Sequence, residues 1–158
     1  MTNRLACDRA DRFAAIAPAA GTLGVGVPCQ PTRPVSVLAI HGTDDPVVPF
    51  DGGRMIGRGG ASTIVSAPDM AARWRSLDDC PEQLRTAELA DPGDGTRVEQ
   101  TFAEGCRDGT EVVFDQVDGG GHTWPGGWQY LPVAVIGRTS KALDASEASW
   151  AFFAAHHR

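Results

Sequence analysis

The stretch Val35-Ser36-Val37-Leu38-Ala39-Ile40-His41-Gly42 is the clearest strand in this chain. It is apolar on both of its faces, which is typical of a central parallel strand covered by helices. Thr43-Asp44-Asp45-Pro46-Val47-Val48-Pro49 follows at once. Open α/β sheets place their ligands and reacting groups beyond the carboxyl ends of such strands. The stretch therefore predicts an α/β fold with functional side chains just after Gly42.

A second strand is predicted over residues 110–118, which are rich in β-branched and aromatic residues. It leads into Gly119-Gly120-Gly121-His122-Thr123-Trp124-Pro125-Gly126-Gly127. Five glycines in nine residues allow positive φ angles and close backbone approach. A histidine just past a strand end is a candidate proton-transfer group, although an exposed turn histidine is the alternative interpretation.

Asp45 and His122 therefore follow two neighbouring strands of the predicted sheet. A carboxylate in that position orients an imidazole by accepting its Nδ1–H and stabilises the imidazolium as it forms. Asp44 is a rival for the role of the acid because the two aspartates are adjacent. The order strand–Asp–helix–strand–His–helix is also the second half of the Ser…Asp…His order of α/β hydrolases.

Turn and capping signals predict the remaining elements. Ser66-Ala67-Pro68-Asp69 starts a helix with a hydroxyl N-cap, and Asp144-Ala145-Ser146-Glu147 is a capping-box start for the last helix. The turn Asp91-Pro92-Gly93-Asp94-Gly95 predicts an antiparallel hairpin between residues 85–90 and 97–102. The other expectations are a short strand within 13–21, a glycine-rich connection over 51–60, an irregular segment over 126–141, and an inward face of the last helix made by Trp150, Phe153 and Ala154.

Length and charge limit the classes of protein to consider. The chain has 158 residues, 42% hydrophobic and 22% charged, which suits one globular domain. A net charge of −6 gives no basic surface for nucleic acid, and no stretch approaches the roughly 18 apolar residues of a membrane span. The four histidines lack paired ligand spacing, so no metal is expected. No cofactor is expected either.

Four cysteines form an even set that suits two disulfides in an oxidising compartment. Four cysteines allow three connectivities. In one of them, a Cys80–Cys106 bridge would pin the hairpin to the end of the preceding helix, and the remaining pair would be Cys7–Cys29. Reduced, buried thiols are the alternative. Charged residues interrupt the first nine positions, so these positions do not form a signal peptide.

The chain also resembles a known group. His41-Gly42-Thr43-Asp44-Asp45-Pro46-Val47-Val48-Pro49 and Gly120-Gly121-His122-Thr123-Trp124-Pro125-Gly126-Gly127 are similar to the two C-terminal motifs of the polyhydroxybutyrate depolymerase and feruloyl esterase group of α/β hydrolases. Residues 13–21 and 150–153 also match that group. The resemblance implies a secreted Ser-His-Asp carboxylic-ester hydrolase. In it Asp45 is the triad acid, His122 is the base, and Trp124 lines the substrate site or packs the loop.

The sequence departs from that group in its nucleophile. It contains no G-x-S-x-G elbow: its seven serines lie in a strand, in loops or at helix starts, and none sits on a strand-to-helix elbow. We therefore expect residues 1–158 to form a single, partial hydrolase domain that lacks the N-terminal strands, the serine and the oxyanion hole. Such a chain is expected to be inactive alone and to expose a sheet edge through which it self-associates. The alternatives are a non-catalytic binding protein and a hydrolase that uses activated water.

Overall fold

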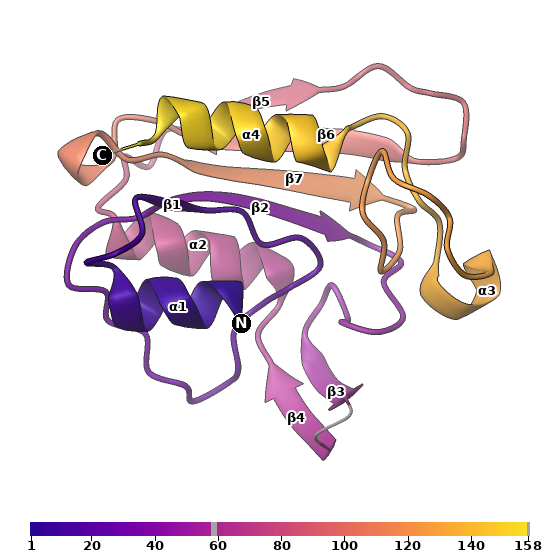
Figure 1. Cartoon of the computed structure of the whole chain (residues 1–158), viewed down its shortest axis with the longest axis horizontal. Helices are drawn as coiled ribbons and strands as arrows, with labels where there is room; N and C mark the ends of the chain where they lie inside the picture. Colours follow the sequence, from indigo (N-terminus) through magenta and orange to yellow (C-terminus); the bar gives the residue numbers. More distant parts are fainter. Residues whose placement is uncertain (58–59, 158) are drawn as a thin grey trace.

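The computed structural model describes residues 1–57 and 60–157, and its elements form three layers (Figure 1). A five-stranded sheet is the middle layer. Helix α4 (Ala145–Ala155) covers one face, and α1 (Thr2–Arg9) with α2 (Ala67–Leu77) covers the other. Two one-turn elements, η1 (Arg107–Gly109) and α3 (Val133–Ile136), lie in connections. The predicted fold class, α/β with a sheet flanked by helices, is confirmed.

The sheet has the strand order β1-β2-β7-β6-β5. Strands β1 (Ala15–Ile16), β2 (Ser36–Gly42) and β7 (Val112–Asp118) are parallel, whereas β6 (Arg97–Ala103) and β5 (Arg85–Glu88) continue the sheet antiparallel. The predicted hairpin therefore exists, and it joins the parallel strands as one edge of the same sheet. Because of it, the sheet as a whole is partly parallel and partly antiparallel.

A separate two-stranded hairpin, β3 (Gly53–Gly57) with β4 (Gly60–Ile64), replaces the glycine-rich connection that the sequence predicted. Residues 58 and 59 of that predicted connection lie outside the described residues. Gly52 and Gly53 have positive φ angles and turn the chain into β3. Glycines therefore mark the bends of a hairpin here and do not prevent strand pairing. The hairpin projects away from the main sheet in Figure 1.

One apolar cluster lies between the sheet and helices α1 and α2, and a second lies between the sheet and α4. All seven residues of β2 are buried, as expected for a strand covered on both faces. Helix α2 begins as predicted, with the Ser66 Oγ accepting from the Asp69 N–H at 3.0 Å. Its Trp74 is fully buried and donates from Nε1 to Asn3 Oδ1 at 3.0 Å, which ties α1 to α2. The layer formed by these two helices therefore has both an apolar core and a buried polar link.

Helix α4 begins at the predicted Asp144 cap but presents a different face to the sheet. Its buried residues are Ala145, Ser149 and Phe152, whereas Trp150 is 75% and Phe153 is 40% exposed, and Ala154 is also exposed. The predicted inward face was therefore wrong. Small side chains at Ala145 and Ser149 allow the helix axis to lie close to the sheet, and helix packing distance depends on the side chains at the contact.

The four cysteines form the two expected disulfides, Cys7–Cys29 and Cys80–Cys106. The first fixes α1 to the loop before β2, and the second joins the ends of α2 and β6. Among the residues described, no helix has the length and apolar character needed to cross a membrane.

Candidate active site

Asp45 lies in a turn directly after β2 (residues 45–48, the Asp45 turn). Its carboxylate is fully buried. The Asp45 Oδ1 accepts from the backbone N–H groups of Val47 and Val48 at 2.8 and 2.7 Å. This is the side chain-to-backbone turn that aspartate favours, and two N–H donors stabilise its charged form. The local sequence therefore both buries the carboxylate and fixes its orientation.

Residues 119–127, the His122 loop, approach the end of β2 closely. The Gly120 carbonyl accepts from the Asp44 N–H at 2.9 Å, and a Cβ at Gly42 would collide with that carbonyl. A Cβ at Gly121 would likewise collide with the Ile136 carbonyl and Gly137. The His122 N–H donates to that same Ile136 carbonyl at 2.6 Å. Glycine is thus required because two backbone segments pack directly against the histidine's own backbone.

The two groups meet at the carboxyl edge of the sheet. The His122 Nδ1 lies 2.9 Å from Asp45 Oδ2, and the His122 side chain is 31% exposed. Because a carboxylate only accepts, Nδ1 carries the proton and Nε2 remains as the basic nitrogen. The hydrogen bond to Asp45 raises the pKa of His122 above its ordinary value, and burial opposes this shift. The imidazole is therefore oriented and made more basic while part of it stays accessible.

The neighbouring Asp44 has a different environment. It is exposed, and it contributes to this edge through its backbone N–H, which binds the Gly120 carbonyl. Of the two adjacent aspartates, Asp45 is thus the one whose carboxylate contacts His122.

Three aromatic residues follow His122 closely in the chain, and one of them contacts its backbone. Trp124 is 43% exposed and donates from Nε1 to Ser146 Oγ at 3.0 Å. Trp128 and Tyr130 are more exposed, and the Tyr130 hydroxyl donates to the His122 carbonyl at 3.1 Å. Sequence reasoning missed these two residues because the segment after the loop has no regular pattern. The cluster of aromatic residues close to His122 was the available signal.

His41 is a third titratable group near the pair, and the sequence indicated it only as part of a motif. Its ring is buried, and its Nε2 lies 2.9 Å from the Val48 carbonyl and 3.7 Å from Asp45 Oδ2. Burial lowers the pKa of His41 below its ordinary value, against the opposing effects of the Val48 carbonyl and the Asp45 charge. The two histidines near Asp45 thus have pKa values shifted in opposite directions.

The serines lie elsewhere. Within residues 1–57 and 60–157, the side chain of His122 hydrogen-bonds to Asp45 and to no serine. Several serine hydroxyls contact other groups, such as Ser66 at the α2 cap and Ser140 beside Thr96. The same described part of the chain contains no group of three or more His, Cys, Asp or Glu side chains that could hold a metal ion.

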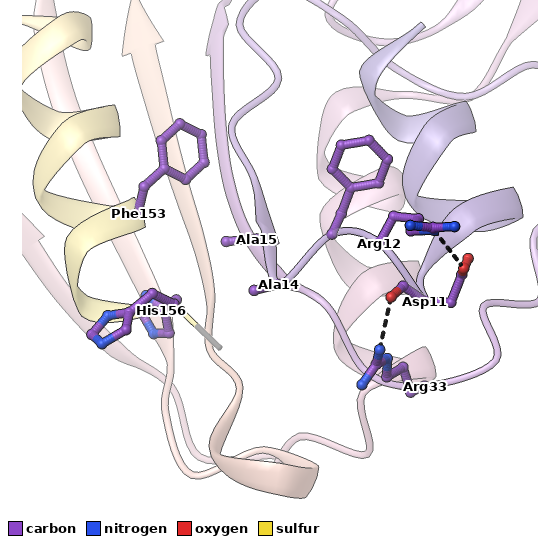
Figure 2. A pocket seen from close by; sticks show the side chains of 9 residues that line it. Asp11, Arg12, Ala14, Ala15, Arg33, Phe153 and His156 are labelled. Carbon is purple, nitrogen blue, oxygen red and sulfur yellow. Dashed lines mark hydrogen bonds and ion pairs between the residues drawn. The ribbon is translucent and has the colours of Figure 1, made fainter.

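A cavity of about 480 Å³ lies at the opposite ends of the parallel strands. Figure 2 shows Ala14 and Ala15, at the start of β1, between Phe153 and His156 at the end of α4 on one side and Asp11 with Arg33 on the other. Its arginines are already engaged, because Arg33 donates to the Ala10 and Asp11 carbonyls and Arg12 pairs with the Asp11 carboxylate. Neither Asp45 nor His122 lines this cavity, so it is separate from the Asp45–His122 site.

Together these features define an α/β protein with a hydrogen-bonded Asp–His pair at the carboxyl edge of its sheet. Acyl-transfer hydrolases contain a pair of this kind. Comparison with known proteins points the same way. The chain is 34% identical to the "Putative esterase NocK" of Nocardia uniformis subsp. tsuyamanensis, over 93% of this chain and 45% of that protein. It is 32% identical to "Feruloyl esterase B" of Piromyces equi, over 77% of this chain and 22% of that protein.

A third relative, "Probable feruloyl esterase C" of Aspergillus flavus, is 31% identical over 98% of this chain and 46% of that protein. No protein-family model matches the chain. The chain is thus homologous to esterases over most of its length, and it spans less than half the length of each of these relatives.

Proposed function

We propose that this chain carries the acid–base part of a carboxylic-ester hydrolase site, of the feruloyl esterase and polyhydroxybutyrate depolymerase type. The observation that carries the proposal is the contact of 2.9 Å between Asp45 Oδ2 and His122 Nδ1 at the ends of two adjacent parallel strands. Homology to proteins named as esterases supports it. In this proposal His122 transfers protons and Asp45 orients its ring.

The proposed reaction is acyl transfer through a serine. His122 Nε2 takes the proton of the serine hydroxyl as its oxygen attacks the ester carbonyl, and then gives that proton to the departing alcohol. In the second half, Nε2 takes a proton from water as the water attacks the acyl-enzyme, and returns it to the serine as the acid leaves. Throughout, the negative Asp45 stabilises the imidazolium. No serine of the described residues contacts His122, so the nucleophile and oxyanion hole are proposed to come from polypeptide outside residues 1–158.

We propose Trp124 as a substrate-binding residue. It follows the base by two positions, and its indole is held by Ser146 while part of its surface stays open. An aromatic side chain fixed in this way offers a rigid apolar contact to the acyl group or alcohol of an ester. The substrate class proposed is therefore a carboxylic ester, with polyester, feruloyl and acetyl-xylan esters as members to test. The two disulfides favour an oxidising, extracellular site of action.

The test compares two preparations on p-nitrophenyl butyrate, methyl ferulate and hydroxybutyrate oligomers. One is the 158-residue chain, and the other is the product of the longest reading frame that contains it. We expect no turnover above buffer from the first. We expect the second to hydrolyse at least one ester and to lose about 10³-fold or more in kcat on His122→Ala.

Turnover by the 158-residue chain that disappears in His122→Ala would contradict a nucleophile from outside residues 1–158. It would favour water activated by the Asp45–His122 pair. A longer product without activity on any ester would overturn the proposed function.

One observation favours a second function, that of a non-catalytic binding protein. Strand β1 is at the edge of the sheet, and the cavity in Figure 2 lies along it, with Phe153 partly exposed beside it. Unpaired strand edges are sites for strand addition. This function predicts a discrete, cooperatively folding oligomer on sizing chromatography without esterase activity, and a monomeric or aggregated product would exclude it.

A further inference from the structure

A second histidine shares the surroundings of the acid in the proposed pair. His41 is the sixth residue of β2, four positions before Asp45, and its side chain is 1% exposed. Its ring meets Phe50 edge to face at 5.9 Å, and Phe50 in turn stacks on Phe114 of β7. The orientation of the imidazole is therefore set by packing. A buried histidine so close to a triad acid needs an explanation, because it could compete with His122 for the same carboxylate.

The hydrogen bonds determine which nitrogen of His41 carries the proton. Its Nε2 lies 2.9 Å from the Val48 carbonyl, which can only accept, so Nε2 must donate. The distance of 3.7 Å from Nε2 to Asp45 Oδ2 is too long for a hydrogen bond. The other nitrogen, Nδ1, is buried and has no partner in the described residues. His41 therefore hydrogen-bonds to the backbone of the Asp45 turn and does not compete with His122 for Asp45 Oδ2.

Val48 connects His41 to the acid. Its carbonyl accepts from His41, and its N–H donates to Asp45 Oδ1 at 2.7 Å. One peptide residue is thus fixed on both sides, by the histidine of the strand and by the carboxylate of the turn. With Oδ1 held in this way, the remaining oxygen of the carboxylate points to His122 Nδ1. Removal of the His41 donor would release the Val48 carbonyl and with it the orientation of the carboxylate.

We propose that His41 is a positioning residue of the site: as a neutral donor to the Val48 carbonyl, it locks the Asp45 turn so that Oδ2 faces His122. This inference rests on the proposed function of the Asp45–His122 pair. Its physical effect, however, is on the His122 ring and can be measured without turnover. The titratable groups that face one another here are His41, Asp45 and His122.

The chain contains only four histidines, so long-range ¹H–¹⁵N spectra of their rings can be assigned across a pH titration. In the unmodified chain we expect His41 to remain the Nε2–H tautomer over the whole range in which His122 titrates. We also expect the His122 Nδ1–H resonance to be protected from exchange. A His41 that titrates together with His122, or that is found as the Nδ1–H tautomer, would overturn the proposal without any variant.

Three variants then separate positioning from packing. In His41→Phe the donor is lost, and the His122 pKa should fall toward its ordinary value with loss of the protected Nδ1–H. In His41→Gln the amide N–H can donate in place of Nε2, so both properties should return. Phe50→Leu is the packing control: it removes the ring contact, keeps the donor, and should leave the His122 pKa unchanged.

A folded His41→Phe protein with an unchanged His122 pKa and Nδ1–H would contradict positioning and leave His41 as a core residue. If His41→Phe does not fold, the tautomer measurement on the unmodified chain decides. Absence of esterase activity in the longer reading frame would count against the proposed function. The NMR measurements on the His41 and His122 rings would still test the positioning role, because they need no turnover.

Discussion

Asp45 and Asp115 are both buried aspartates, one in the turn after β2 and the other within the neighbouring strand β7, yet the two carboxylates differ in how many hydrogen bonds they receive. Asp45, just after β2, has both carboxylate oxygens hydrogen-bonded, to two backbone N–H groups and to His122. Asp115, in the middle of β7, receives one hydrogen bond from Gln100 on Oδ1, and its Oδ2 has no partner in the described part of the chain. Burial raises the pKa of Asp115 to about 6.

Asp78, at the end of α2, repeats the pattern of Asp115. Its Oδ1 accepts from the Val35 N–H at 3.2 Å, its Oδ2 has no partner among the described residues, and burial raises its pKa to about 7. The comparison teaches that a buried carboxylate is suited to orient an imidazole only where donors converge on both oxygens. At the carboxyl edge of the sheet the Asp45 turn and His122 supply those donors, whereas Asp78 and Asp115 receive a donor on one oxygen each.

Removal of the carboxylate from the satisfied site should have a large effect on stability. Asp45→Ala leaves the Val47 and Val48 N–H groups without their acceptor in a buried turn, which should lower the free energy of unfolding by about 3 kcal/mol. Asp44→Ala is the matched control and should change it by less than about 0.5 kcal/mol because Asp44 is exposed. Denaturant unfolding of both variants measures the difference. Equal effects would mean that the Asp45 turn does not depend on its carboxylate.

At Asp78 and Asp115, removal of the carboxylate should instead increase the free energy of unfolding, and the size of this effect should depend on pH. A carboxyl whose pKa is raised on folding is stabilising when protonated, so its contribution is present below about pH 4 and is lost as the pH rises toward the folded value of about 7 for Asp78. Asparagine does not titrate. The stability of Asp78→Asn relative to the unmodified chain should therefore rise by roughly 3–4 kcal/mol between pH 4 and pH 8. Parallel stability curves in urea at the two pH values would contradict the raised pKa.

Asp115→Asn should behave in the same way but more weakly, because its folded pKa of about 6 lies closer to the unfolded value. We expect a relative gain of roughly 2–3 kcal/mol over the same pH range, complete by about pH 7. A pH-independent difference between this variant and the unmodified chain would show that the pKa of Asp115 is not raised on folding.

The smallest effect is expected on the exposed face of α4. Trp150→Ala should change the free energy of unfolding by less than about 0.5 kcal/mol, whereas Phe152→Ala should lower it by about 3 kcal/mol through loss of buried surface. Thermal or urea unfolding of the two variants tests which face meets the sheet. A larger loss from Trp150→Ala would restore the orientation that the sequence predicted.

The sequence predicted those parts of the molecule whose signals are local. The unbroken apolar run before Gly42 identified β2, and the Ser66 and Asp144 caps identified the starts of α2 and α4. The even set of cysteines indicated disulfides, but the sequence leaves their pairing open and the structure shows it. The predicted strand ends also indicated Asp45 and His122 as candidates, because parallel strands end at one edge of a sheet.

The parts that could not be predicted depend on contacts between distant segments. Helix α4 is apolar on several sides, so its sequence does not show which side meets the sheet; the structure buries Ala145 and Ser149 and exposes Trp150. The glycines at 52 and 53 gave no sign that β3 and β4 pair. Similarly, the donor role of His41 depends on where the Val48 carbonyl points, which is a property of the folded turn.

The most direct test of the central claim is the pKa of His122, measured by NMR titration of the unmodified chain and of Asp45→Asn. A carboxylate that orients and charges the imidazole predicts a His122 pKa above the ordinary 6.5 in the unmodified chain. It also predicts a decrease in Asp45→Asn, in which the turn keeps an acceptor but loses the negative charge. A His122 pKa at or below about 6.5 in both proteins would contradict the claim that Asp45 and His122 form a functional pair.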